Sequence, residues 1–106
     1  MHIAKSQAVS DNWDGVKSYN YKLKHLSPYQ SVVHAAIKGE HGEETTEDVE
    51  VIYYIISGQG RFIFNNQKVE VEPGDVLTIP PHTTYNYFSN ADTTLEIVLF
   101  CELWDN

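Results

Sequence analysis

Short alternating or fully apolar stretches follow one another along the chain, separated by turns rich in glycine, proline and asparagine. We predict strands at residues 16–23, 31–37, 49–56, 61–64, 69–72, 76–79, 83–88 and 95–100. No segment carries the sustained apolar stripe that is typical of an amphipathic helix. Many short strands and no helix predict an all-β sandwich or barrel, and 106 residues suffice for one domain over residues 1–106.

Successive side chains of a strand point to opposite sides, so residues two apart share a face. We therefore expect Val51, Tyr53 and Ile55 on one face of their strand, and Tyr85 and Tyr87 on one face of theirs. Residues 31–37 are apolar on both faces, as a buried strand would be.

The composition limits the partners and the compartment. A formal net charge of −8 disfavours nucleic acid and anionic membrane surfaces, which attract clustered lysine and arginine. Cys101 is the single cysteine, so no intrachain disulfide can form. No apolar run reaches the length of a membrane span, and the N-terminus lacks the apolar core of a signal peptide. We expect a soluble, cytoplasmic protein.

Two glycine-anchored segments carry the most specific information. Gly39 and Gly58 bracket the first, which ends in the run Tyr-Ile-Ile-Ser-Gly-Gln-Gly, and Gly74 and Pro80 belong to the second. In residue type and spacing these segments resemble the two signatures of the cupin superfamily, written G-x5-H-x-H-x3-E-x6-G and G-x5-P-x-G-x2-H-x3-N. The resemblance implies a jelly-roll barrel, also called a double-stranded β-helix.

The chain departs from these signatures where the family holds its metal. Thr45, Glu47 and Val51 stand at the ligand positions of the first signature, and Tyr85 stands at the histidine of the second. Among the four, only Glu47 keeps a group that can bind a cation, whereas such centres need about three or four imidazole or carboxylate donors. We therefore predict that the chain carries no metal and no other cofactor.

The family register would place Thr45, Glu47, Val51 and Tyr85 on the inner face of the barrel. The two-residue period of a strand then carries Tyr53 and Tyr87 inward as well. From this register we predict one interior pocket lined by Glu47, Tyr53, Tyr85 and Tyr87, with His34 as a further lining residue. Such a pocket suits a small polar organic molecule, sugar-like or carboxylate-bearing, that is bound without turnover or sensed.

Several alternatives remain open at this point. The tyrosines can instead fill the space that the metal leaves, which would give a structural barrel. The chain can also be an enzyme, either similar to sugar isomerases and epimerases or dependent on a metal held by His34, His41 or His82 with Glu47. Arg61, the only arginine, can bind a ligand carboxylate or a surface acid. We also expect a homodimer, with residues 16–23 contributing to the interface, because small barrels have strand edges to protect.

Overall fold

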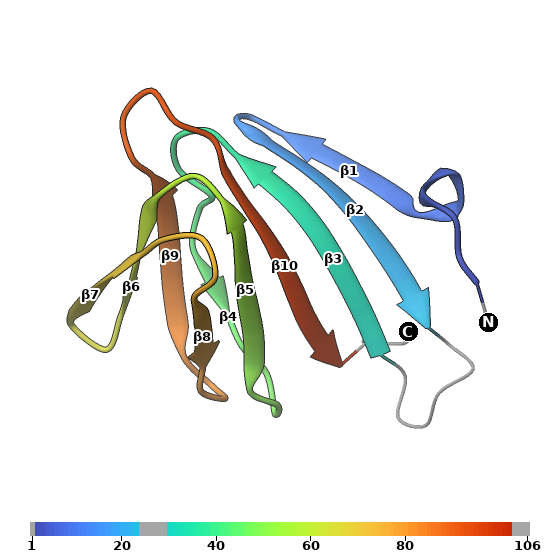
Figure 1. The fold of residues 1–106 in the computed structure, drawn as a ribbon. Coiled ribbons are helices and arrows are strands. Elements are labelled where there is room, and N and C mark those ends of the chain that lie inside the picture. The colour runs from blue at the N-terminus through green and yellow to red at the C-terminus, as the bar shows by residue number, and fades with distance from the viewer. Residues whose placement is uncertain (1, 24–29, 103–106) are drawn as a thin grey trace.

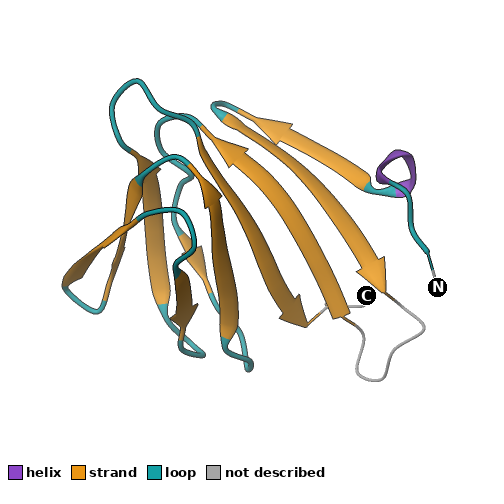
Figure 2. Cartoon of the chain, viewed as in Figure 1, coloured by secondary structure: helices purple, strands orange, loops and turns teal. Residues whose placement is uncertain are grey.

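Two antiparallel sheets lie face to face and enclose the core in the computed structural model, which describes residues 2–23 and 30–102 (Figure 1). The larger sheet has the order β1-β2-β3-β10-β5-β8 and the smaller sheet has the order β4-β9-β6-β7. Apart from a 3-10 turn, η1 (Lys5–Gln7), the described chain contains strands and loops only, as Figure 2 shows. After β3 the chain passes back and forth between the sheets, except at the hairpin of β6 and β7, which stays within the smaller sheet. This is the jelly-roll arrangement that the sequence predicted.

The strands are β1 (Val9–Trp13), β2 (Val16–Leu23), β3 (Gln30–Ile37), β4 (Glu44–Thr45), β5 (Val51–Ser57), β6 (Gly60–Phe64), β7 (Gln67–Val71), β8 (Val76–Ile79), β9 (Thr84–Ser89) and β10 (Leu95–Glu102). Each predicted strand is present, with ends shifted by two residues at most. The sequence did not predict β1 or β4. Both are hard to recognise, because every residue of each strand is exposed and neither shows a clear apolar alternation.

The inner faces of both sheets carry the predicted alternation. Tyr53 and Ile55 of β5 are buried, and so are Tyr85 and Tyr87 of β9, while their neighbours face outward. The buried core also contains Phe62 from β6, and the two sheets therefore share one hydrophobic interior.

Turn residues determine where the strands reverse. Asn65 and Asn66 both adopt positive φ (52° and 60°) in the two-residue turn between β6 and β7. Two consecutive positive φ values define a type I′ turn, which asparagine tolerates better than most residues. Gly58, between β5 and β6, combines a φ of 80° with a backbone so close that an added Cβ would lie 2.1 Å from the Thr94 carbonyl oxygen.

Among the residues that the structure describes, no helix has the length and apolar character needed to cross a membrane.

Candidate functional site: a tyrosine-lined cavity

A cavity of about 360 Å3 opens between the two sheets. Both sheets contribute to its wall, and β1 and β2 form the side nearest the edge of the larger sheet. The lining residues are Val9, Asp11, Trp13, Ser18, Asn20, Lys22, Val33, Ala35, His41, Glu44, Tyr53, Tyr85, Tyr87, Ile97, Leu99 and Cys101. We call this space the tyrosine cavity.

Three tyrosines from two strands form its innermost wall. The hydroxyl oxygens of Tyr53 and Tyr85 are 2.5 Å apart, so one phenol donates a hydrogen bond to the other. The Tyr53 ring contacts Tyr85 and Tyr87 edge to face, with centroids 6.0 Å and 5.4 Å away. Tyr87 stacks on Phe62 at 4.5 Å, which anchors the cluster in the core. Edge-to-face and stacked geometries are the favourable ones for aromatic pairs.

Burial keeps these phenols protonated. Removal from water raises the pKa of Tyr85 to about 12, although the hydrogen bond from Tyr53 opposes the shift in part. Burial and, secondarily, the repulsion that a phenolate at Tyr53 would meet from an ionised Tyr87 or Tyr85 raise the pKa of Tyr53 well above its ordinary value. Burial likewise raises the pKa of Tyr87. At neutral pH the tyrosine cavity therefore presents neutral hydroxyls, which can donate and accept hydrogen bonds.

His41 lies in the loop before β4 and covers Tyr87. Its ring stacks on Tyr87 at 4.4 Å, and its backbone N–H donates to the Tyr87 carbonyl oxygen at 2.9 Å. His41 Nδ1 is 3.0 Å from the Gly42 carbonyl oxygen, and because a carbonyl only accepts, Nδ1 carries the proton. In the neutral ring, Nε2 then has a lone pair, and no hydrogen bond joins it to any described residue.

Trp13 stands beside His41 at the open end of the tyrosine cavity. The edges of the two rings meet at a centroid distance of 5.3 Å, and Trp13 Nε1 donates to the His41 carbonyl oxygen at 3.1 Å. Trp13 is 41% exposed, which is more than the other aromatic residues that line this cavity, His41, Tyr53, Tyr85 and Tyr87. An open aromatic surface of this kind can cover a planar ligand group.

The wall made by β1 and β2 is polar. Alternate residues of β2 face inward, which places Ser18, Asn20 and Lys22 in the tyrosine cavity together with Asp11 of β1. The Ser18 hydroxyl donates to the Asp11 carbonyl oxygen at 2.8 Å, and the Ser31 hydroxyl donates to the Asn20 side-chain oxygen. The amide, ammonium and carboxylate groups of this wall therefore face the phenols across the tyrosine cavity.

The register of β4 differs from the expected one by one residue. Glu44 pairs with the buried Tyr85, and Thr45 pairs with the exposed Thr84. Residues opposite each other in antiparallel strands share a face, and a one-residue shift exchanges the faces. Glu44 consequently lines the tyrosine cavity, whereas the Thr45 hydroxyl bonds to Thr84 on the other side at 2.8 Å. The expectation that Thr45 points inward is wrong.

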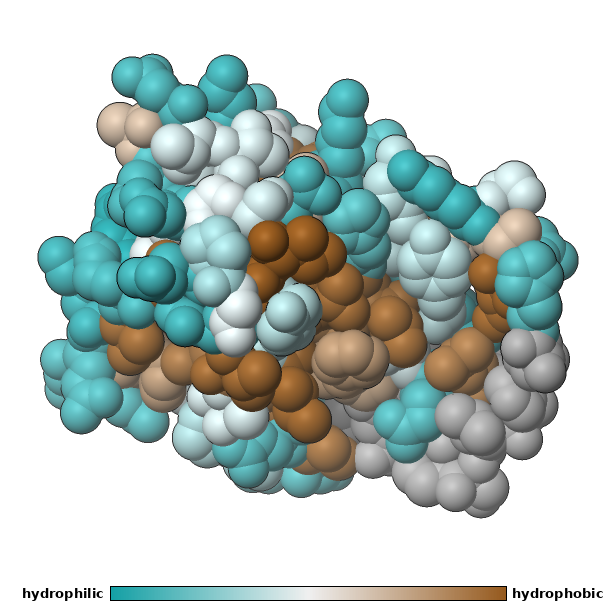
Figure 3. Space-filling view, viewed as in Figure 1, coloured by the Kyte–Doolittle hydropathy of each residue, from teal (hydrophilic) through white to brown (hydrophobic). Residues whose placement is uncertain are grey.

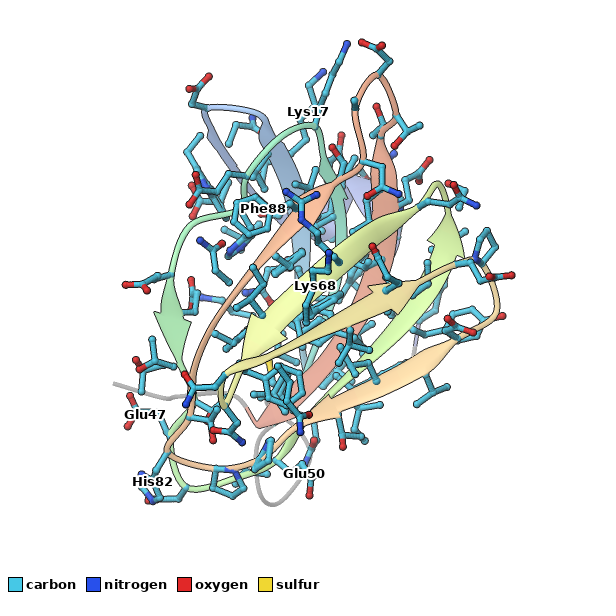
Figure 4. All side chains as sticks on the ribbon, turned by 90° about the vertical axis from the view of Figure 1, so that its left-hand side faces the viewer. Lys17, Glu47, Glu50, Lys68, His82 and Phe88 are labelled. Atoms are coloured by element: carbon cyan, nitrogen blue, oxygen red, sulfur yellow. The ribbon has the colours of Figure 1, made fainter. Side chains whose placement is uncertain are left out.

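Glu47 lies at the edge of the site. Its side chain is exposed, and it lines a shallow recess of about 170 Å3 together with Thr45, Val51 and Tyr85. Figure 4 shows Glu47 and His82 at the same end of the molecule, and the backbone N–H of His82 donates to the backbone carbonyl oxygen of Glu47 at 2.9 Å. Tyr85 borders both spaces, so Glu47 is next to the tyrosine cavity and does not line it.

His34 lies on the outer face of the larger sheet, which corrects the expected lining. Val33 and Ala35 of β3 face the tyrosine cavity, and the residue between them must face the opposite side. There His34 Nε2 lies 3.0 Å from a Glu96 carboxylate oxygen, and its ring lies beside Tyr19.

The remaining candidates do not converge. His82 pairs with Asp48 at 3.2 Å on the surface, and Arg61 lies over the Phe88 ring at 4.6 Å on the outer face of the smaller sheet. Within residues 2–23 and 30–102, no three histidine, cysteine, aspartate or glutamate side chains are grouped so that they could hold a metal ion.

Sequence reasoning brought together Tyr53, Tyr85 and Tyr87 but missed His41, Glu44 and the polar wall. One signal for the wall was present. Ser18, Asn20 and Lys22 are spaced two apart after the apolar Val16, which is buried at 1% exposure, so they had to share its inner face. Nothing in the sequence indicated that β1 would complete that wall.

Comparison with solved structures identifies similar folds. Pac13, a nucleoside dehydratase from Streptomyces, is 26% identical, with a TM-score of 0.83 over 100% of this chain and 84% of that one. Variants of Pac13 with a tyrosine replaced by phenylalanine, or a histidine replaced by glutamine, have been solved with uridine. A predicted oxalate decarboxylase from Thermotoga maritima has a TM-score of 0.82 at 19% identity, over 98% of this chain and 100% of that one.

An uncharacterized protein of Methanocaldococcus jannaschii is 36% identical over 58 residues. The match covers 55% of this chain and 44% of that protein, which is less than half of the relative's length. The Cupin domain family matches residues 32–101, and these are more than half of the chain. With the jelly-roll arrangement of its strands, this match establishes that the chain belongs to the cupin family.

Proposed function

We propose that the tyrosine cavity binds an uncharged nucleoside or a closely related sugar derivative, without a metal. One observation carries the proposal: a cavity of about 360 Å3 with neutral phenols on one wall and amide, ammonium and carboxylate groups on the other. Pockets for small organic molecules have volumes of roughly 300 to 1,000 Å3 and few polar groups on an otherwise apolar lining. The likeness to a nucleoside dehydratase supports the choice of ligand class.

The chemistry of the two walls suits the two halves of a nucleoside. Sugar hydroxyls can exchange hydrogen bonds with Tyr85, Asn20 and Asp11, which border the tyrosine cavity. The exposed ring surface of Trp13 at the open end can cover a planar base. The ligand would replace water at both walls, and the buried tyrosines would not need to move.

Charge argues against a nucleotide. Asp11 and Glu44 line the tyrosine cavity, Glu47 lies next to it, and Lys22 is the only lysine or arginine that the structure places in its wall. A phosphate carries close to two negative charges at neutral pH, and the surrounding carboxylates would repel it. We therefore expect a nucleoside to bind more tightly than its 5′-monophosphate.

Calorimetric titration with uridine and with uridine 5′-monophosphate tests the proposal. We expect uridine to bind, and Tyr85→Phe to weaken binding roughly 2- to 10-fold, the effect of one lost hydrogen bond. Tyr54→Phe is the matched control, because Tyr54 lies on the outer face of β5 and should leave the affinity unchanged. If neither uridine nor any of the other common nucleosides binds at millimolar concentration, the proposal is wrong.

A second candidate, acid–base catalysis on the bound nucleoside, is favoured by the geometry of His41. Its Nδ1 proton points to the Gly42 carbonyl oxygen, so that Nε2 is available as a base when the ring is neutral. In a dehydration, such a base takes a proton from carbon, and a phenol can protonate the departing hydroxide.

NMR assay of nucleosides that carry a carbonyl group on the sugar would detect this activity, because the carbonyl acidifies the neighbouring C–H. We expect His41→Gln to abolish loss of water while uridine still binds. Binding without any turnover would leave the first proposal standing and remove the second.

A further inference from the structure

His41, the base named in the second candidate function, lies on a short loop between two glycines. Gly39 and Gly42 adopt φ values of 99° and 105°, and nothing lies within 4 Å of a Cβ added to either. Glycines in such open surroundings allow a loop to take several conformations. The position of the His41 ring therefore depends on contacts between the loop and the rest of the fold.

Strand β9 supplies most of these contacts. Figure 4 shows the loop that leads to β4 passing beside the upper half of β9. The Gly39 N–H donates to the Ser89 hydroxyl at 2.8 Å, and the Gly39 carbonyl oxygen accepts from the Ser89 backbone N–H at 2.9 Å. Glu40 then forms an isolated bridge with Phe88. The part of the loop that precedes His41 is thereby tied to β9.

One side chain of β9, Asn86, bonds to the loop on both sides of His41. Its Oδ1 accepts from the Gly42 backbone N–H at 2.9 Å, and its Nδ2 donates to a Glu40 carboxylate oxygen at 2.6 Å. The backbone N–H of Tyr87 donates to the same Oδ1 at 2.8 Å. Since N–H groups only donate and an ionised carboxylate only accepts, these partners fix the orientation of the Asn86 amide. We call this arrangement the Asn86 clamp.

The Asn86 clamp holds the peptide group that follows His41. The N–H of this peptide, from Gly42, donates to Asn86, and its carbonyl oxygen, from His41, accepts from Trp13 Nε1 at 3.1 Å. The Gly42 carbonyl oxygen in turn accepts the proton of His41 Nδ1 at 3.0 Å. The hydrogen bond at one ring nitrogen of a histidine determines which nitrogen carries the proton. Holding Gly42 in place therefore leaves Nε2 as the basic nitrogen.

The Asn86 clamp lies outside the tyrosine cavity. Tyr85 and Tyr87 are buried on the inner face of β9, so Asn86 between them lies on the outer face of the smaller sheet. Figure 3 shows mostly hydrophilic side chains on the left of the molecule, where this sheet lies, and the bond to Glu40 is exposed. One exposed hydrogen bond contributes little to the free energy of unfolding. Its loss should displace the loop without unfolding the chain.

We propose that Asn86 is a positioning residue. It holds the loop so that the His41 ring stacks on Tyr87 with an unprotonated Nε2, which can then take a proton from a bound nucleoside. The inference rests on the base role proposed for His41. Asn86 acts through the loop, from the outer face of the sheet, and takes no part in proton transfer.

NMR of the ligand-free protein tests the proposal, through amide hydrogen exchange and through 15N spectra of the histidine rings at about pH 8, where an ordinary histidine is neutral. Asn86→Ala removes both bonds of the clamp. We expect the Gly42 amide to exchange roughly 3- to 10-fold faster, the effect of one lost hydrogen bond, and the His41 ring to become a mixture of its two neutral tautomers. Thr84→Ala is the matched control, because Thr84 lies on the same face of β9 and bonds to Thr45 of β4. It should leave both signals unchanged.

A paired substitution provides a rescue. Asn86→Asp keeps the acceptor for Gly42 but sets a carboxylate against that of Glu40, and the repulsion should disturb the His41 ring. Adding Glu40→Gln supplies an amide donor opposite the new carboxylate. The double variant should therefore recover the wild-type tautomer and the slow exchange at Gly42. Where a nucleoside is turned over, Asn86→Ala should lower kcat about tenfold and leave KM within about twofold.

Unchanged exchange at Gly42 and an unchanged His41 ring in Asn86→Ala would overturn the proposal. A double variant no closer to wild type than Asn86→Asp would overturn it too, as would an equal effect of Thr84→Ala. Both NMR measurements use ligand-free protein, so they decide the role of Asn86 independently of whether uridine binds.

Discussion

At the scale of single residues, a tyrosine phenol stands where the family signature has a metal-binding imidazole. Tyr85 occupies the place of a family histidine and turns inward, where it meets Tyr53 at 2.5 Å between hydroxyl oxygens. A phenol is a poor metal ligand while it is protonated, and burial keeps it protonated by raising its pKa. The same substitution that removes a metal donor therefore supplies a neutral hydrogen-bonding group.

The raised pKa values predict that the protein loses stability in alkali. Tyr85 has a pKa of about 12 in the folded chain and about 10 when unfolded, and Tyr53 and Tyr87 shift in the same direction. Below pH 10 both states hold these protons. Between pH 10 and 12 only the unfolded state releases them, so the free energy of unfolding falls with rising pH, by up to about 3 kcal/mol for Tyr85.

Urea titrations at pH 8, 10 and 11 measure this loss. Tyr85→Phe should reduce the dependence on pH, and Tyr54→Phe on the outer face should retain it. An unfolding midpoint that is the same for wild type and Tyr85→Phe at every pH would contradict the shift.

At the scale of elements, turns and register decide which side chains reach the site. The turn at Gly58 joins β5, which carries Tyr53, to β6, which carries Phe62. In β4, two residues suffice to turn Glu44 inward and Thr45 outward. The position of each inner residue therefore depends on backbone geometry several residues away.

Gly58→Ala should destabilise the fold severely. A Cβ at this position would lie 2.1 Å from the Thr94 carbonyl oxygen, in addition to the strain of a φ of 80°. Gly74→Ala is the control, because its φ is 92° but nothing lies within 4 Å of its added Cβ. We expect about 1 to 2 kcal/mol for Gly74→Ala, from backbone strain alone, and a larger loss for Gly58→Ala. Equal losses in chemical denaturation would show that the close contact is relieved at little cost.

At the scale of the whole molecule, the cupin fold persists without the family's set of metal donors. Val51 and Tyr85 stand at two of the four ligand positions, Thr45 points away from a third, and Glu47 lies at the surface. A fold and the site it usually carries are separable, since the core packs through other residues.

We predict that the purified protein contains far less than one transition metal per chain. Three of the four donor positions lack imidazole or carboxylate groups, and one carboxylate alone binds transition metals weakly. Elemental analysis of tag-free protein measures the content, and dialysis against zinc or manganese followed by thermal unfolding serves as the control, with no rise in Tm expected. A one-to-one content of manganese, iron, nickel, copper or zinc would contradict this prediction.

Much of the fold was accessible from the sequence alone, because its signals are local. Strand alternation placed Tyr53, Tyr85 and Tyr87 on inner faces, and glycine spacing identified the family. The same alternation places Ile52, Tyr54 and Ile56, spaced two residues apart, together on the outward face of β5.

The sequence by itself determined the jelly-roll class, the facing of β5 and β9 and the loss of the metal donors, since each depends on residue type and short-range spacing. Only the tertiary structure decided that Glu44 and not Thr45 faces inward, that His34 faces outward, and that His41 stacks on Tyr87. These placements depend on pairing between distant segments, β4 with β9 and β3 with β10. A shift of one residue in such a pairing exchanges the two faces of a strand, and no local pattern in the short β4 specifies that register.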